Sequence, residues 1–201
     1  MNDADGPVDL LLRVDPRWIE LPLRTPGDLD AWATAEVASA AALRGRVEEP
    51  SVLVLCEQVY LAVVEQLRAR TPVPAAAFAL VSDQDLLPVT VVELTSHPLD
   101  GAGFDAFVDA LVVDASERFD GPLVDEVVTA LGVAARVEQL RVVSETTGDG
   151  QEVQTSVVYA WPVSSGRSAL TLSAWFDSPV DAELNRAVLE DLAVSLHPRL
   201  R

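Results

Sequence analysis

The chain has 201 residues with 14 basic and 32 acidic side chains, which gives a formal net charge of −18. Nucleic acids and anionic membrane surfaces attract positively charged proteins, so this charge argues against either partner. A basic protein partner, or simple solubility, fits the charge better. Apolar residues make up 49% of the chain. That share is enough for a buried core and argues against disorder over most of the length.

The sequence predicts a single folded α+β domain over residues 8–201, preceded by a disordered acidic tail at residues 1–7. The N-terminus lacks the basic region of a secretory signal, and no uncharged apolar run is long enough to span a membrane. Cys56 is the only cysteine, which leaves no intrachain disulfide. We therefore expect a cytoplasmic protein.

The first part of this domain, residues 8–74, is expected to hold two short edge strands and a pair of helices. The apolar segments Val8–Val14 and Trp18–Leu23 are broken by prolines, which edge strands tolerate. Thr25 is a candidate N-cap for the first helix, which is predicted to end near Gly45.

A second helix is predicted to begin at Ser51. Its apolar residues run nearly all round the helix, a pattern that indicates burial on most sides. The valines within Ser51–Leu55 also suit a strand, so both structures stay open for that short segment. Cys56 lies within the apolar run, and we interpret it as a buried, unreactive thiol.

Residues 75–201 are predicted to contain the main sheet and a C-terminal helix. Two short polar turns, Gly148-Asp149-Gly150 and Ser164-Ser165-Gly166, separate strand-like runs and indicate antiparallel hairpins. The predicted order is Ala75–Val81, Val89–Leu94, a helix from Phe104, Val124–Leu131, Arg136–Glu145, Gln151–Pro162, Ser168–Phe176 and a helix in which Val180, Leu184, Val188 and Leu192 share one face. This order favours a mainly antiparallel sheet with helices on both faces, plus the N-terminal helical pair.

The predicted order resembles the α/β/α sandwich of the PsbP-like superfamily over roughly Ala75 to Leu196. The whole chain is also similar to a group of uncharacterised actinobacterial proteins. The segments that carry this similarity are Trp18-Ile19-Glu20-Leu21-Pro22, Val89-Thr90-Val91-Val92-Glu93 and Tyr159-Ala160-Trp161-Pro162-Val163. Because known PsbP-like proteins mostly bind proteins or small ligands, the resemblance implies a binding function without catalysis. The chain lacks the lipid-attachment cysteine of the secreted relatives.

The catalytic patterns sought in the sequence are missing. It holds no Gly-x-Ser-x-Gly elbow, no P-loop and no dinucleotide-binding glycine motif. Its two histidines, His97 and His197, each precede a proline, and with one cysteine they do not make a zinc site of the usual spacing. We therefore expect no cofactor and no metal. Catalysis is the less favoured function, although the sequence does not refute a Ser-His-Asp triad.

The segment from Asp100 to Glu126 carries eight carboxylates and a single arginine. The candidate interaction surface within it consists of Asp100, Asp105, Asp109, Asp114 and Glu117. Three interpretations stay open: an ordinary solvated surface, a docking surface for a basic partner, and a divalent cation site. The spacing of these residues does not match an EF-hand loop.

Two of the four tryptophans, Trp161 and Trp175, lie on neighbouring predicted strands. Large aromatic residues on a sheet usually pack against helices as core. If the two tryptophans instead meet at an open end of the sheet, they form a candidate ligand pocket together with Arg136 and Arg141.

These observations predict a non-catalytic cytoplasmic protein that binds another protein. An antitoxin-like or immunity-like role, in which an acidic face covers a basic toxin, is one form of this function, and a homodimer stays open. The alternative is a small-ligand-binding protein or enzyme that uses the candidate pocket near Trp161 and Trp175.

Overall fold

The computed structural model describes residues 10–12, 16–24, 27–45, 49–82, 84–99, 101, 103–112, 120–144 and 151–198. The chain divides into two compact units, one made of Met1–Val14 with Ser96–Arg201 and the other of Asp15–Thr95. The sequence predicts one domain with an internal boundary at residue 74. The division at residue 95 lies later than this predicted boundary. The two N-terminal helices need strands from both sides of residue 75 to cover their apolar faces, so these strands belong to the same unit.

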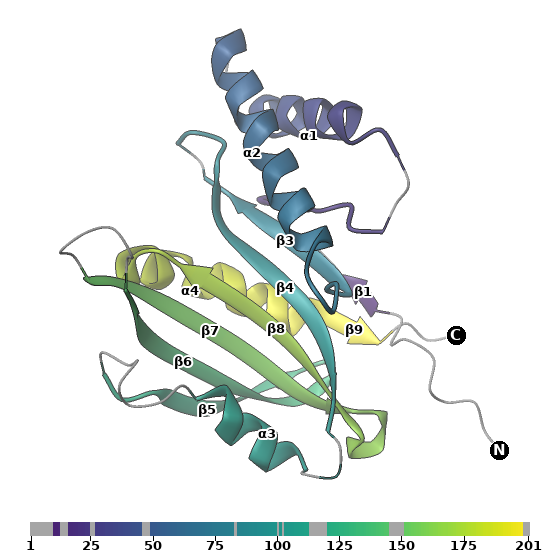
Figure 1. The fold of residues 1–201 in the computed structure, drawn as a ribbon, viewed down its shortest axis with the longest axis vertical. Helices are drawn as coiled ribbons and strands as arrows, with labels where there is room; N and C mark the ends of the chain where they lie inside the picture. Colours follow the sequence, from purple (N-terminus) through teal and green to yellow (C-terminus); the bar gives the residue numbers. More distant parts are fainter. Residues whose placement is uncertain are drawn as a thin grey trace. The chain divides into compact units, whose positions relative to one another are not determined.

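The Asp15–Thr95 unit contains the N-terminal helical pair and a small sheet (Figure 1). Its elements are β2 (Trp18–Glu20), α1 (Leu29–Leu43), α2 (Pro50–Arg68), β3 (Ala76–Val81) and most of β4 (Pro88–Pro98). β3 pairs antiparallel with both β2 and β4. The helical pair and the three strands were predicted, although β4 runs four residues beyond the expected Leu94.

The other unit holds the rest of the sheet and the last two helices. Its elements are β1 (Leu10–Leu12), α3 (Phe104–Leu111), β5 (Leu123–Thr129), β6 (Gly132–Ser144), β7 (Gln151–Val163), β8 (Ser168–Phe176), α4 (Pro179–Ser195) and β9 (Leu196–Pro198). β5, β6, β7 and β8 form an antiparallel meander, and β1 pairs antiparallel with β9. The turn at Ser164–Gly166 is where the sequence predicts it, whereas the turn at 148–150 lies outside the described residues.

Seven strands form one antiparallel sheet in the order β2-β3-β4-β8-β7-β6-β5. The fold is therefore of the predicted α+β class. α2 is the one described helix that is long and apolar enough to cross a membrane by length and composition. A buried core helix of a globular unit passes the same test, so this feature is weak evidence for a membrane span.

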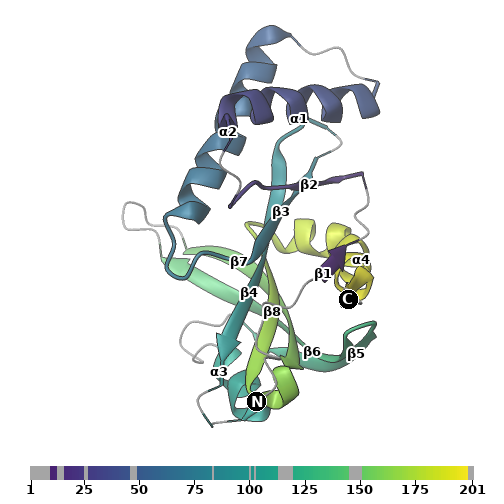
Figure 2. The same cartoon turned by 90° about the vertical axis from the view of Figure 1, so that its right-hand side faces the viewer.

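The two faces of the β5–β8 meander carry different helices (Figure 2). On β6, the carboxylate of Glu138 binds the guanidinium of Arg186 in α4, with Nη2 and Oε1 2.8 Å apart. The next residue, Gln139, points to the other face, where its Nε2 donates to the carbonyl oxygen of Leu111 in α3 at 3.0 Å. We call these the α4 face and the α3 face. Helices on both faces confirm the predicted layer arrangement for this unit.

The central strand β7 is buried on both faces, but its side chains differ in size. Tyr159 and Trp161 point to the α4 face and are completely buried. Val158 and Ala160 between them point to the α3 face and are also buried. The large residues on the α4 face pack with the long helix α4, whereas the smaller residues leave more room on the α3 face.

The side of α4 that packs on the sheet agrees only in part with the prediction. Val180 and Leu184 are 65% and 73% exposed, whereas Val188 and Leu192 are buried as expected. An α-helix has 3.6 residues per turn, so each four-residue step rotates a position by about 40°. Over three such steps, the residues of the predicted stripe no longer share the buried face of the helix. The other buried residues of α4 are Ala182, Leu189 and Ala193.

The helical pair differs from the prediction in two details. α1 begins at Leu29, and its N-cap is Asp28, whose Oδ1 accepts from the backbone N–H of Asp30 at 3.1 Å. The predicted cap, Thr25, lies outside the described residues. The sequence predicts that α2 is buried on most sides, but α2 buries a single stripe of residues, and Val54 and Leu55 are about half exposed.

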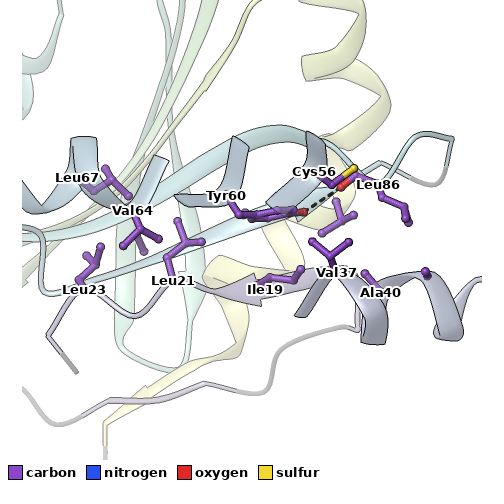
Figure 3. Close-up of a cluster of buried hydrophobic side chains, with 14 residues drawn as sticks. Ile19, Leu21, Leu23, Val37, Ala40, Cys56, Tyr60, Val64, Leu67 and Leu86 are labelled. Atoms are coloured by element: carbon purple, nitrogen blue, oxygen red, sulfur yellow. Dashed lines mark hydrogen bonds between the residues drawn. The ribbon is translucent and has the colours of Figure 1, made fainter. Parts of the chain in front are cut away.

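The core of this unit is tied to the hairpin loop between β3 and β4 (Figure 3). The buried stripe of α2 consists of Cys56, Tyr60, Val64 and Leu67. The Tyr60 hydroxyl donates to the carbonyl oxygen of Leu86 at 3.2 Å, and the Cys56 thiol lies 3.6 Å from that of Asp85. Leu86 is fully buried although its φ is +62°, a value that costs a residue with a side chain of order 1 kcal/mol or more. Burial of its side chain and the bond to its carbonyl hold the loop in this conformation.

Tyr60→Phe is expected to destabilise the protein by about 1–2 kcal/mol, because it leaves the buried Leu86 carbonyl oxygen without this donor. Urea unfolding, followed by circular dichroism, measures the change. Tyr159→Phe is the matched control, since the Tyr159 hydroxyl is buried beside Arg136 without a well-aligned hydrogen bond. Equal losses of stability in the two variants would contradict the assignment of the Tyr60 bond.

Candidate functional site

A concave pocket of about 510 Å³ lies on the α3 face. One wall comes from α3, and the floor and the other wall come from β5 and β6. The apolar lining consists of Phe104, Val108, Val124, Val133, Ala135 and Pro162, and the acidic lining of Asp105, Asp109, Asp125 and Glu126. A volume of this size is typical of a binding pocket for a small molecule or a few side chains of a partner.

α3 presents both kinds of lining because of its sequence. Phe104 and Val108 are four residues apart, as are Asp105 and Asp109, so each pair occupies one side of the helix. The apolar pair is half-buried toward the strands, and the acidic pair is exposed. The helix therefore places two carboxylates on the rim above an apolar wall.

α3 is held on the sheet by few contacts, and none of its residues is fully buried. The ring of Phe107 packs on that of His97, at the end of β4, with centroids 5.3 Å apart. His97 Nε2 in turn lies 2.9 Å from the hydroxyl of Thr171 on β8. With the bond from Gln139 to the C-terminal turn of α3, these contacts fix the wall of the pocket.

Glu126 of β5 adds a third carboxylate to the pocket, on the α3 face of the sheet. By the β5–β6 register, Val124 and Glu126 point to the α3 face, and Asp125 between them points to the α4 face. Asp105, Asp109 and Glu126 are all exposed. No basic side chain contributes to the described lining, so the pocket combines an apolar floor with negative charge on its rim.

Asp125 is paired with a basic residue on the α4 face. Its carboxylate accepts from Arg136 on β6, with Nε–Oδ1 and Nη2–Oδ2 separations of 2.8 and 2.5 Å. Arg136 also reaches Glu190 of α4 at 3.4 Å. The hydrogen bonds to Asp125 raise the pKa of the Arg136 guanidinium, so Arg136 remains charged and neutralises Asp125 on the α4 face.

The residues of the candidate interaction surface are only partly placed by the structure. Asp105 and Asp109 lie together at the pocket. Asp100, Asp114 and Glu117 lie outside the described residues. The sequence missed Glu126 as a member of this surface, although the alternation of Val124, Glu126 and Val128 on β5 is the signal that could have placed it there.

The four residues of the candidate tryptophan pocket do not come together. Trp161 pairs with Leu170 across the β7–β8 hairpin, and Trp175 pairs with Ser156, which puts the two tryptophans on opposite faces. Trp161 shares the α4 face with Arg136, whereas Trp175 and Arg141 point to the α3 face. The sheet itself separates the two halves of this predicted pocket.

Trp161 is part of the core. Its side chain is completely buried, and its Nε1 donates to the hydroxyl of Thr129 on β5 at 2.9 Å. The same hydroxyl donates to the carbonyl oxygen of Gly132 at 2.8 Å and so closes the β5–β6 turn. Burial with a satisfied indole N–H is typical of a structural tryptophan.

Other reactive groups lie apart from the pocket. Cys56 is completely buried in the Asp15–Thr95 unit, and His197 is an exposed residue of β9. In the part of the chain that the structure describes, no three His, Cys, Asp or Glu side chains are grouped closely enough to hold a metal ion.

No protein-family model matches the chain, and neither the curated proteins nor the solved structures include a match to it. The PsbP-like resemblance stays a prediction.

His97 is expected to make stability depend on pH. Burial lowers the pKa of its imidazole from the usual value of 6.5, so the folded state disfavours the protonated form. The contribution of the neutral His97 imidazole to the free energy of unfolding is present above pH 6.5. It is lost as the pH falls below that value, because the unfolded chain then binds the proton more readily than the folded one.

The measurement is urea unfolding at pH 7.5 and 5.5 for the protein and for His97→Gln, which removes the titrating group and keeps a polar side chain beside Thr171. The loss of stability between the two pH values should be smaller in the variant. An identical loss in both proteins would show that His97 does not contribute.

Asp109→Asn is expected to stabilise the protein slightly. Asp109 stands four residues after Asp105 and in the C-terminal half of α3, where both the like charge and the helix dipole disfavour a carboxylate. The gain should be a few tenths of a kcal/mol to about 1 kcal/mol, measured by thermal unfolding at low ionic strength. Asp191→Asn, at an exposed position of α4, is the control and should change stability less.

Proposed function

We propose that this protein is a non-catalytic interaction protein that binds a basic segment of a partner protein in the pocket between α3 and the β5–β6 edge. The observation that carries the proposal is the lining of that pocket, in which every charged residue is acidic and the remaining surface is apolar. Arginine and lysine side chains suit such a lining, because their aliphatic stems cover apolar surface while their charged heads reach the rim.

The charge of the chain supports the same proposal. With a formal net charge of −18, the protein attracts basic partners from a distance, and the pocket supplies a place where a basic side chain is held. Asp105 and Asp109 repel each other on α3 in the free protein. A bound cation relieves that repulsion, so part of the binding free energy comes from the unfavourable arrangement of the free site.

The biological setting is part of the proposal. A PsbP-like fold and a cytoplasmic location are consistent with a small acidic protein that has one cysteine and binds other proteins. An immunity-like or antitoxin-like protein, which covers the basic surface of a toxin, is one form of this function. The alternative of a ligand site near the tryptophans has less support, because Trp161 and Trp175 lie on opposite faces of the sheet.

The test uses a fluorescein-labelled peptide with the sequence Thr-Val-Thr-Arg-Thr-Val-Thr, blocked at both ends, and measures its binding by fluorescence anisotropy. The triple variant Asp105→Asn, Asp109→Asn, Glu126→Gln should weaken binding roughly 3- to 10-fold, the effect of losing exposed charge contacts. Raising the salt concentration from 20 mM to about 150 mM should also weaken binding, because the Debye length shortens to about 8 Å.

The control is Glu20→Gln, Glu65→Gln, Asp191→Asn, which makes the same change in net charge at exposed residues that do not line the pocket. Binding to this control should stay close to that of the unchanged protein. Equal weakening in both triple variants would show that only net charge matters, and that result, or no binding of the peptide at low salt, would overturn the proposed function.

A further inference from the structure

β5 lies at the end of the sheet order, and no described strand pairs with its outer side. In an antiparallel sheet, alternate residues of an edge strand turn their N–H and C=O groups away from the neighbouring strand. Such a row of groups is a template for one more strand unless the protein protects the edge.

The described part of β5 carries little of the usual protection. The strand Leu123–Thr129 contains no proline and no lysine, and its register with β6 is unbroken over seven residue pairs, so no bulge twists it away. Val128 is 79% exposed and Val124 50% exposed. Asp125 is neutralised by Arg136, so Glu126 is the one carboxylate of β5 that no described basic side chain pairs with.

The same strand forms a wall of the pocket. Val124 and Glu126 belong to both features, and Val128 continues their row on the α3 face. A strand added beside β5 would place every second side chain on this face, next to Val124, Glu126 and Val128 in turn. The residue beside Glu126 would also lie on the side of the sheet where Asp105 and Asp109 form the rim.

We propose that the partner segment binds as an added β-strand along the outer edge of β5, with a central arginine or lysine on the α3 face and an apolar residue two positions away on each side. This inference rests on the proposed function and specifies the partner's conformation and pattern. Main-chain hydrogen bonds to β5 supply affinity, and the alternate side chains supply specificity, as in other strand additions.

A second copy of this chain fits the edge less well than a basic partner. Glu126 is the middle residue of β5, so two copies related by a two-fold axis at that residue would place Glu126 opposite its own equivalent. The surrounding pocket adds the like charges of Asp105 and Asp109. A basic strand replaces these repulsions with attraction.

The test compares the peptide Thr-Val-Thr-Arg-Thr-Val-Thr with Thr-Val-Arg-Thr-Thr-Val-Thr, which has the same composition and charge. Moving arginine by one position turns it to the opposite face of an added strand, where Asp125 is already neutralised. We expect the second peptide to bind about tenfold more weakly. Versions of the first peptide with single N-methylated amides should lose affinity at alternate positions only, because alternate amides face β5.

Equal affinity for the two arginine positions, together with no alternation in the effect of N-methylation, would overturn strand addition. If both peptides still lose affinity in the pocket triple variant, the proposed function survives that result. No binding of either peptide at low salt would overturn both proposals.

A pair of valine substitutions gives an independent measurement on the protein side. Val128→Lys should weaken binding of the first peptide, since lysine on an edge strand opposes strand addition and repels the basic peptide. Val180→Lys adds the same charge at an exposed valine of α4 and should leave binding unchanged. Sedimentation velocity of the free chain adds a third readout: a dimer that Val128→Lys abolishes and Val180→Lys keeps would assign the edge to a second copy and overturn the proposal.

Discussion

The difference in side-chain size between the two faces of β7 is the constraint on which the described β5–β8 region depends. Tyr159 and Trp161 fill the α4 face, so a long helix with small and branched residues can bury them completely. Val158 and Ala160 on the α3 face are smaller, and the helix on that face, α3, is short and buries none of its own residues. The space that remains between α3 and the strands is the pocket. A central strand with equally large residues on both faces would demand a larger second helix.

The charged residues of the β5–β8 region also differ between the α4 face and the α3 face. On the α4 face, Arg136 and Arg186 each bind a sheet or helix carboxylate, so the acidic residues there are neutralised. On the α3 face, Asp105, Asp109 and Glu126 stand at a pocket to which no described basic side chain contributes. At this pocket, exposed carboxylates therefore stand directly beside apolar surface.

The sequence predicts the local structure well, and its failures come from long-range geometry. The Gly-containing turn at Ser164–Gly166 and the alternation along β7 predict the hairpin and its faces. The residue pairing across that hairpin also places Trp161 and Trp175 on opposite faces of the sheet. The candidate pocket was predicted only because the two tryptophans lie on neighbouring strands. The predicted face of α4 was right at Val188 and Leu192 but wrong at Val180 and Leu184, because four-residue spacing drifts around the helix. The sequence predicts Asp105 and Asp109 as surface residues but not the pocket they line, since α3, β5 and β6 meet only in the folded sheet.

The β3–β4 hairpin shows how a loop residue can be more restricted than many core residues. Loop tips usually tolerate substitution because they are exposed and conformationally adaptable. Leu86 combines a left-handed backbone with a completely buried side chain. Glycine would relax the backbone but leave a void, and a β-branched residue would fill the space at a higher conformational cost. In a library of random variants, position 86 should accept few replacements, and a search for tolerant insertion points should avoid this hairpin despite its place between two strands.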